Sequence, residues 1–242
     1  MSTPLVIRDR NTMRNLTLTN QTMGRRIGFV PTMGSLHAGH TSLVDRAMAE
    51  CDDVVTSIFV NPSQFGPQED FDRYPRDFNA DFNLLAQHDV RWIFAPDVHE
   101  MYPPGDSTRI EISGPAEPYE GQLRPGHFSG VATIVFRLLQ STPANTVYFG
   151  AKDWQQVLVV RQMVHDLGLD VEVMTCPIVR YKDGLALSSR NAYLSESERT
   201  RAQTIYSALQ QAEENWCRGL AIDNIELNLS LIHISEPTRL GF

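Results

Sequence analysis

The stretch GFVPTMGSLHAGHTSLVDRA, residues 28–47, decides the fold class. It begins as an apolar run typical of a buried strand, turns at Gly34, and continues as a helix whose apolar residues share one face. Two histidines, His37 and His40, stand three residues apart at the turn. A strand that passes through a glycine turn into a helix is the building unit of parallel α/β sheets. The stretch therefore predicts one such unit, with two imidazoles at its turn.

The rest of the chain repeats this alternation of strand and helix. The strand patterns are apolar throughout, as expected for a parallel sheet that helices cover on both faces. We predict an α/β fold, a Rossmann-like doubly wound parallel sheet. Strands are expected at residues 26–30, 53–60, 90–95, 145–150 and 169–175, and helices at residues 41–50, 78–88, 130–140 and 153–168.

Three polar motifs directly follow predicted strands. PTMGSLHAGH (31–40) follows the first strand, NPSQFG (61–66) the second and GAKDWQQ (150–156) the fourth. Right-handed crossovers bring the carboxyl ends of parallel strands to one edge of a sheet, where the ligands of such sheets bind. We therefore expect all three motifs at the same edge.

The chain changes character after Cys176. A Lys-Asp-Gly turn and a Ser-Ser-Arg-Asn run come first. Ser195 and Glu198 then predict a capping box, which begins a long helix that ends near Gly219. These signals indicate a second structural unit rather than another strand and helix of the sheet.

We expect two domains and a foreign end. Residues 1–176 form the Rossmann-like domain, and residues 177–229 form part of a smaller α+β domain. Residues 230–242 continue no periodic pattern and resemble translated adapter DNA, so we interpret them as a non-native tail. On this interpretation the second domain is truncated, and we expect the tail to pack poorly.

Composition narrows the class of protein. The 242 residues carry a net charge of −8, and 42% of them are hydrophobic. The apolar content argues against global disorder, and the acidic balance argues against nucleic acid as the main partner. No apolar run reaches the roughly 18 residues of a membrane span, and the three cysteines form no C-x-x-C pair. We expect a cytoplasmic protein with no nucleic-acid or membrane partner.

The paired histidines admit several interpretations. The start of a helix carries the positive end of its dipole, and His37 and His40 share a helical face if the helix has begun. Two imidazoles there could donate hydrogen bonds to phosphoryl oxygens. An ordinary capping turn with two surface histidines is the alternative from sequence alone. A zinc pair would need a third ligand, and no cysteine lies nearby in the sequence.

Five motifs in one order carry a family resemblance. HAGH resembles the H-x-G-H signature of the nucleotidylyltransferase superfamily. With VPTMGSLHAGH, the motifs IFVNPSQFGPQEDFDRYPR, LRPGHFSGV, FGAKDWQQ and DGLALSSRN resemble the pantothenate synthetases, or pantoate–β-alanine ligases, from about Leu5 to Asn224. The resemblance implies that ATP adenylates pantoate and that the amine of β-alanine then displaces AMP, giving pantothenate. It also implies Mg²⁺ and a homodimer.

The resemblance implies roles for individual residues. His40 matches the proton donor, His37 its partner on the phosphates, and Lys152 and Arg190 further catalytic groups on phosphate. Gln64 and Gln156 match the glutamines that bind pantoate. The ATP-binding set comprises Met33, Gly34, Ser35, Leu36, His37, Ala38, Gly39, His40, Gly150, Ala151, Lys152, Asp153, Val179, Leu187, Ser188, Ser189 and Arg190.

Several assignments stay open. Asp77 and Asp81 lie where the family places a magnesium-facing carboxylate, and we assign neither. Arg124 and His127 lie in a loop that the resemblance puts over the pantoate pocket and near a subunit interface. Two other functions are kept: a different H-x-G-H nucleotidyltransferase, and a truncated chain that binds nucleotide without turnover.

Overall fold

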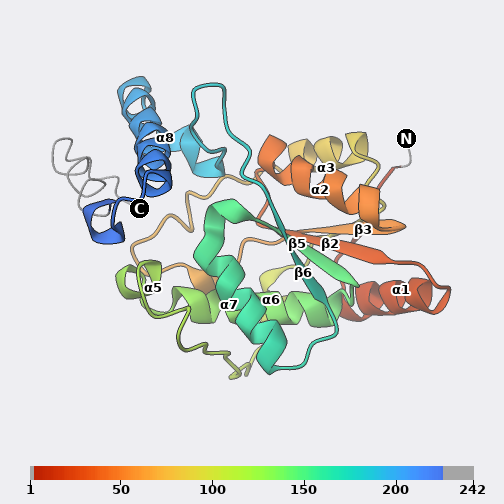
Figure 1. Ribbon diagram of the computed structural model, residues 1–242. Helices are drawn as coiled ribbons and strands as arrows, with labels where there is room; N and C mark the ends of the chain where they lie inside the picture. Colours follow the sequence, from red (N-terminus) through yellow and green to blue (C-terminus); the bar gives the residue numbers. More distant parts are fainter. Residues whose placement is uncertain (1–2, 226–242) are drawn as a thin grey trace. The chain divides into compact units, whose positions relative to one another are not determined.

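The computed structural model describes residues 3–225 (Figure 1). These residues divide into two compact units, and the first ends at Ile178. The predicted functional division at residues 176 and 177 stays a prediction, and the expected tail at residues 230–242 lies outside the described residues. The elements are β1 (Leu5–Ile7), α1 (Arg10–Thr22), β2 (Ile27–Thr32), α2 (Ala38–Glu50), β3 (Asp53–Ile58), η1 (Pro62–Gln64), α3 (Phe78–Gln87), β4 (Trp92–Phe94), α4 (Val98–Met101), α5 (Glu120–Leu123), α6 (His127–Ser141), β5 (Thr146–Gly150), η2 (Ala151–Asp153), α7 (Trp154–Asp166), β6 (Glu172–Cys176), η3 (Ser189–Tyr193) and α8 (Glu196–Cys217).

The first unit is built on one parallel sheet. Its six strands have the order β1-β4-β3-β2-β5-β6, and every neighbouring pair is parallel. From β2, the chain adds β3 and β4 on one side and later β5 and β6 on the other. The predicted doubly wound fold is therefore confirmed. The strand order reverses between β2 and β5, and such a switch point is where α/β sheets bind ligands.

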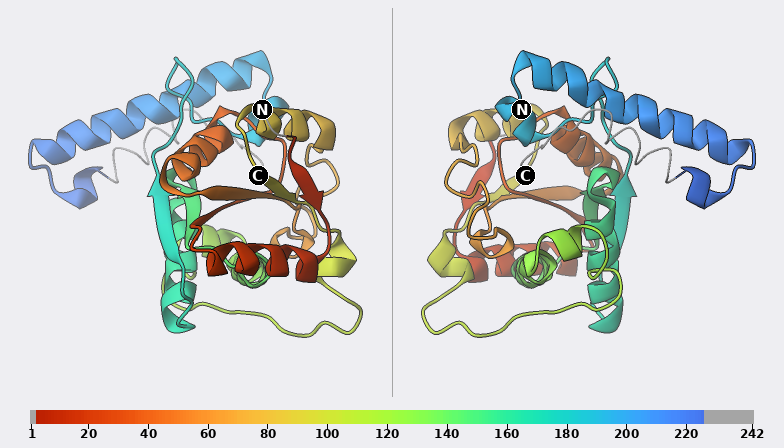
Figure 2. Two further views of the ribbon diagram at one scale, coloured as in Figure 1. Left: turned by 90° about the vertical axis from the view of Figure 1, so that its right-hand side faces the viewer. Right: turned by 90° about the vertical axis from the view of Figure 1, so that its left-hand side faces the viewer.

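Helices cover both faces of the sheet. Successive side chains of a strand point to opposite faces, so Phe29 joins one buried cluster and Val30 the other. The first cluster packs α1, α6 and α7 against the sheet, and the second packs α2 and α3. Figure 2 shows the sheet between these two helical layers. Because both faces are buried, the strands read as continuous apolar runs.

Among the elements that our sequence analysis did not predict are β1 and α1. Helix α1 buries Met13, Thr17 and Asn20. The two polar side chains hydrogen-bond to carbonyls of their own helix, Thr17 to Met13 and Asn20 to Leu16. Because polar residues occupy the buried face, the segment shows no apolar stripe in the sequence.

The second unit begins with the predicted turn and helix. Gly184 has φ +89°, and the N–H of Tyr181 donates to the carbonyl of Leu185. Helix α8 begins at the expected capping box of Ser195 and Glu198 and ends before Gly219, whose φ is +82°. These predictions are confirmed. The large apolar side chains of α8 at Ile205, Leu209 and Trp216 are exposed.

Among residues 3–225, no helix is both long and apolar enough to cross a membrane.

Candidate active site

The turn between β2 and α2 is held by the hydroxyl of Thr32, which links it to β3. Gly34 and Ser35 have φ values of +80° and +50°. The N–H of Gly34 donates to Oγ1 of Thr32 at 3.2 Å, and that hydroxyl donates to the carbonyl of Ser57 at 2.6 Å. Two successive left-handed residues reverse the chain sharply, so the helix can begin at Ala38.

The two histidines meet through reciprocal capping hydrogen bonds. Nδ1 of His37 accepts from the N–H of Gly39 at 3.1 Å, and Nδ1 of His40 accepts from the N–H of His37 at 3.2 Å. The ring centroids are 4.1 Å apart. His37 is the N-cap and lies just outside the helix, so the rings meet through the cap rather than by sharing a helical face.

These hydrogen bonds determine which ring nitrogen carries the proton. An imidazole nitrogen that accepts a hydrogen bond bears no proton, so a neutral ring then carries its proton on Nε2. His37 and His40 are therefore both Nε2–H donors. The N–H of Gly39, in the first turn of α2, is not open to a ligand, because it donates to the His37 ring. The Nε2–H groups of His37 and His40 are hydrogen-bond donors at the start of α2.

The local environment keeps both rings neutral. Burial lowers the pKa of His40 to about 3, with a smaller contribution from His37. Burial also lowers the pKa of His37, and the ammonium of Lys152 adds to the effect. Near neutral pH the two rings act as hydrogen-bond donors without a charge, and Lys152 supplies the positive charge nearby.

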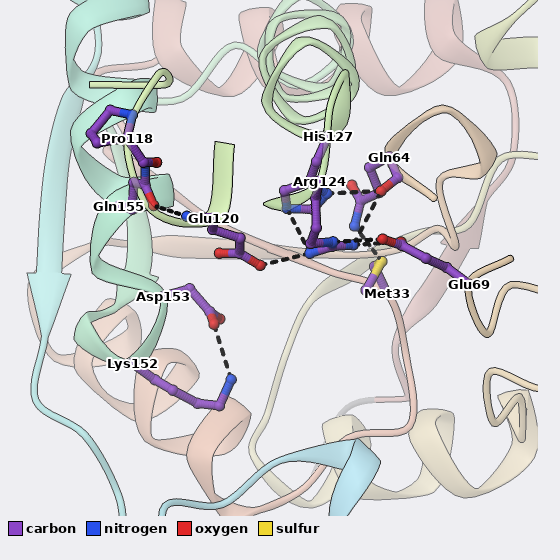
Figure 3. Close-up of polar contacts among 10 residues, drawn as sticks. All are labelled: Met33, Gln64, Glu69, Pro118, Glu120, Arg124, His127, Lys152, Asp153 and Gln155. Carbon is purple, nitrogen blue, oxygen red and sulfur yellow. Dashed lines mark hydrogen bonds and ion pairs between the residues drawn. The ribbon is translucent and has the colours of Figure 1, made fainter. Parts of the chain in front are cut away.

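Lys152 and Asp153 follow β5, the neighbour of β2 in the sheet. Nζ of Lys152 lies 2.9 Å from Oδ1 of Asp153 (Figure 3). Asp153 is the residue before α7, and its carboxylate makes no capping hydrogen bond. Gly150 ends β5 and Ala151 begins the short η2 turn. The first and third motifs therefore flank the switch point.

The second motif is joined to the first by Gln64. Its Nε2 donates to the sulfur of Met33 at 2.9 Å, and its Oε1 accepts from Nδ2 of Asn61 at 3.1 Å. Asn61 is buried, and its Oδ1 also accepts from the hydroxyl of Tyr102 at 2.7 Å. The motifs after β2, β3 and β5 thus lie together at the carboxyl ends of neighbouring strands, as expected.

A cluster around Arg124 fixes the backbone at Gln64 (Figure 3). Nε and Nη2 of Arg124 bind the two oxygens of Glu69 at 2.7 and 2.6 Å, and Nη1 binds Glu120 at 2.7 Å. Nη1 also donates to Nε2 of His127 at 3.1 Å, so the proton of that ring is on Nδ1. Nδ1 then donates to the carbonyl of Gln64 at 2.8 Å.

Gly130 lets α6 approach this turn closely. A Cβ atom at Gly130 would lie 2.2 Å from the carbonyl oxygen of Ser63. The carbonyl of Gly130 accepts from Nδ2 of Asn61 at 3.2 Å. Any side chain at this position would push the turn that carries Gln64 away from the helix.

Two adjacent glutamines of α7 differ in their roles. Gln155 is occupied: its Nε2 donates to the carbonyls of Pro115 and Pro118, and its Oε1 accepts from the N–H of Glu120. Gln156 is half-buried, and its amide makes no hydrogen bond within the part of the chain described. The donors and the acceptor of the Gln156 amide are therefore not used by the described residues.

The remaining predicted ATP residues belong to the second unit. The carbonyl of Val179 accepts from the N–H of Leu187 at 3.0 Å. Ser188 caps the η3 turn by accepting from the N–H of Arg190 at 3.3 Å, and Ser189 is the first residue of that turn. Their role in ATP binding stays a prediction.

The carboxylates considered for magnesium both have structural partners. Asp77 caps α3 by accepting from the N–H of Ala80 at 2.9 Å. Asp81 accepts from the N–H groups of Ser35 and Leu36. Over residues 3–225, no group of three His, Cys, Asp or Glu side chains could hold a metal ion. The metal ligand stays unassigned.

Sequence reasoning missed the residues that support the site. Asn61 lies in a quoted motif, directly after the strand predicted at residues 53–60, and that position could have identified it. Gly130 lies in the quoted motif LRPGHFSGV, but nothing in that motif relates it to Ser63. Tyr102 lies in no quoted motif and acts through a contact distant in sequence.

Fold and site together define a class: a doubly wound α/β protein whose ligand edge carries a histidine-capped helix at the switch point. A sequence model described as pantoate-beta-alanine ligase matches residues 5–237. A pantothenate synthetase from Roseiflexus sp. (strain RS-1) is 56% identical over 192 residues, which are 79% of this chain and 69% of the relative.

Solved structures agree with the sequence comparison. The crystal structure of pantothenate synthetase from Thermus thermophilus superposes with a TM-score of 0.90 at 46% identity, covering 96% of this chain and 83% of that one. Pantoate-beta-alanine ligase from Francisella tularensis, complexed with beta-gamma ATP and beta-alanine, gives a TM-score of 0.83 at 37% identity, with 95% and 86% covered. The chain belongs to the pantoate–β-alanine ligase family.

Proposed function

We propose that this protein is an ATP-dependent ligase that joins pantoate to β-alanine, giving pantothenate, AMP and pyrophosphate through a pantoyl adenylate. The observation that carries the proposal is the reciprocal cap of His37 and His40 beside Lys152 at the switch point. Family membership supplies the substrates: the Francisella relative was solved with an ATP compound and β-alanine.

The first step is attack by the pantoate carboxylate on the α-phosphorus of ATP. A bond forms between carboxylate oxygen and phosphorus, and the bond to the pyrophosphate oxygen breaks. Negative charge moves onto the leaving phosphates, where hydrogen-bond donors that are already in place stabilise it. The Nε2–H groups of His37 and His40 and the ammonium of Lys152 provide such donors. Because burial lowers its pKa, His40 enters the site as a neutral ring that can donate a hydrogen bond from Nε2.

Two amides suit pantoate as a substrate. An amide donates to a carboxylate and accepts from a hydroxyl without adding charge. Gln156 has both functions unused within residues 3–225, and Gln64 is anchored by its backbone and by Asn61. The second step is attack by the β-alanine amine on the activated carbonyl carbon. A C–N bond forms, the bond between the carbonyl carbon and the phosphate oxygen breaks, and the amine loses a proton. AMP leaves readily, because adenylation has replaced a poor leaving group by a good one.

Several parts of the proposal rest on the family resemblance. Mg²⁺ would enter with ATP, held by triphosphate oxygens and water, which suits a site without a three-ligand protein cluster among residues 3–225. When bound, the ion would supply positive charge that partly neutralises the triphosphate. The residues of the second unit that would contact ATP are Val179, Leu187, Ser188, Ser189 and Arg190. We also expect a homodimer in the cytoplasm.

The test is exchange of labelled pyrophosphate into ATP. We expect exchange that requires pantoate and not β-alanine, and AMP release only when both are present. Gln156→Ala should raise the KM for pantoate at least about tenfold while changing the KM for ATP little, because an unpaired polar group of the substrate costs binding. The matched control is Gln162→Ala, because the amide of Gln162 donates to Oδ1 of Asp166 in an exposed contact on α7.

Each failed outcome identifies an alternative. Exchange without pantoate, or with a phosphorylated alcohol in its place, would indicate a different H-x-G-H nucleotidyltransferase. ATP binding without any exchange would indicate a nucleotide-binding chain without turnover.

A further inference from the structure

Asp81 makes an unusual contact with the turn that precedes the histidines. It lies in the first turn of α3 and is 3% exposed. Its Oδ2 accepts from the N–H of Ser35 at 2.9 Å, and its Oδ1 accepts from the N–H of Leu36 at 2.7 Å. A single carboxylate thus binds two consecutive amides of a segment that is more than forty residues away in the chain.

The turn is shaped to receive this carboxylate. Gly34 has φ +80°, and a Cβ atom there would lie 2.8 Å from Oδ2 of Asp81. Ser35 has φ +50°, which L-residues other than glycine adopt only when the surroundings impose it. The two hydrogen bonds from consecutive N–H groups to one carboxylate supply that constraint.

The turn in turn orients both rings. The N–H of Leu36 is held by Asp81, and the next residue, His37, is the N-cap of α2. The N–H of His37 donates to Nδ1 of His40, while Nδ1 of His37 accepts from the N–H of Gly39. A shift in the backbone at residues 35–37 therefore alters the hydrogen bonds of both imidazoles.

We propose that Asp81 is a positioning residue, which sets the backbone of residues 34–37 so that the Nε2–H groups of His37 and His40 are aligned for the phosphates of ATP. The inference rests on the proposed function for what the rings bind. Burial raises the pKa of Asp81 although Ser35 and Leu36 donate to it. Burying a carboxylate costs free energy, and an ordinary turn does not need one, which argues for a role beyond stability.

The test compares Asp81→Asn with Asp77→Asn. Asparagine at 81 has one acceptor oxygen and turns an NH₂ group toward the other backbone N–H, so it cannot hold both amides. Asparagine at 77 still caps α3. The readouts are ¹⁵N–¹H NMR spectra of the histidine rings, pantoate-dependent pyrophosphate exchange, and thermal melting.

Wild type and Asp77→Asn should show His37 and His40 protonated on Nε2 alone. In Asp81→Asn, His40 should no longer be protonated on Nε2 alone. The kcat of exchange should fall about 100-fold, as a misplacement of about 1 Å can cause. The KM of the folded variant for pantoate should change less than about threefold. Should Asp81→Asn not fold, Asp81→Glu gives the second comparison, because it keeps the carboxylate but its extra methylene group displaces the two oxygens from the N–H groups of Ser35 and Leu36.

An unchanged ring spectrum with only a lower melting temperature would overturn the inference and leave Asp81 a structural residue. Altered rings with wild-type kcat would overturn it as well. If the wild type shows no pantoate-dependent exchange, the proposed function fails, yet the ring spectra still test whether Asp81 controls the two imidazoles.

Discussion

At the scale of single residues, the chemistry of His40 is decided by its surroundings. A histidine in water has a pKa near 6.5 and is partly charged near neutral pH. Here burial and the neighbouring His37 lower the pKa to about 3. The backbone N–H of His37 also determines which nitrogen is protonated. A histidine side chain can donate a hydrogen bond from either ring nitrogen. Burial keeps the His40 ring neutral, and the hydrogen bond from His37 places its proton on Nε2.

This environment predicts a pH-dependent stability. The unfolded chain binds a proton at His40 near pH 6.5, but the folded chain does so only near pH 3. Stability contributed by neutral His40 is therefore lost as the pH falls below 6.5. Between pH 7.5 and 5.5, the wild type should lose up to about 1.4 kcal/mol more unfolding free energy than His40→Asn, measured by urea denaturation.

Asparagine is the chosen substitution because its Oδ1 can still accept from the N–H of His37. The comparison concerns the change with pH, so a constant difference in stability between the two proteins does not matter. Equal slopes in wild type and variant would show that His40 titrates normally in the folded state.

At the scale of elements, His37 combines two functions at the start of α2. Its Nδ1 caps the helix, and its Nε2–H faces away from that hydrogen bond. Asparagine is among the best N-cap residues, whereas alanine cannot cap. The two substitutions therefore separate the capping role from the proposed phosphate contact.

His37→Ala should lower the unfolding free energy by about 1 kcal/mol, the usual cost of a lost cap, and His37→Asn should change it by less than about 0.5 kcal/mol. Both should reduce the rate of pyrophosphate exchange about 100-fold, since both remove Nε2–H. Urea denaturation and exchange kinetics measure the two effects. Wild-type exchange in His37→Asn would show that the ring does not act on phosphate.

At the scale of the whole molecule, an ion-pair cluster joins the starts of three neighbouring strands. Asp53 begins β3, and Arg25 and Arg91 precede β2 and β4. The Asp53 carboxylate is buried and binds both guanidinium groups. Burial acts to raise the pKa of Asp53, but the hydrogen bonds from Arg25 and Arg91 outweigh it, and the net pKa is lowered.

Asp53→Asn should therefore destabilise the sheet by about 2–3 kcal/mol, somewhat less than for a fully buried pair because both arginines are partly exposed. Urea denaturation near neutral pH is the measurement. Asp45→Asn is the control, because its contact with His88 lies at the surface and should contribute less than about 1 kcal/mol. Equal effects of the two substitutions would contradict the assigned importance of the cluster.

Much of this architecture could be predicted from local patterns. The strand from Ile27 and the capping box at Ser195 were found because each has a signal within a few residues. Helix α1 was missed because Thr17 and Asn20 occupy its buried face. Asp81 could be located near the site, but its partner could not, since nothing in the sequence relates α3 to residues 35 and 36.

By itself, the sequence determined the α/β class, most strands and helices, and the motifs that mark the family, because periodicity, caps and glycine turns act over short range. Only the tertiary structure decided how the residues of those motifs are arranged, hydrogen-bonded and protonated. Strand order brought the segments after β2, β3 and β5 together, and contacts across the fold settled the protonation of both histidines and the anchoring of Gln64. The physical reason is that hydrogen bonding and burial depend on neighbours in space, which the order of residues along the chain does not specify.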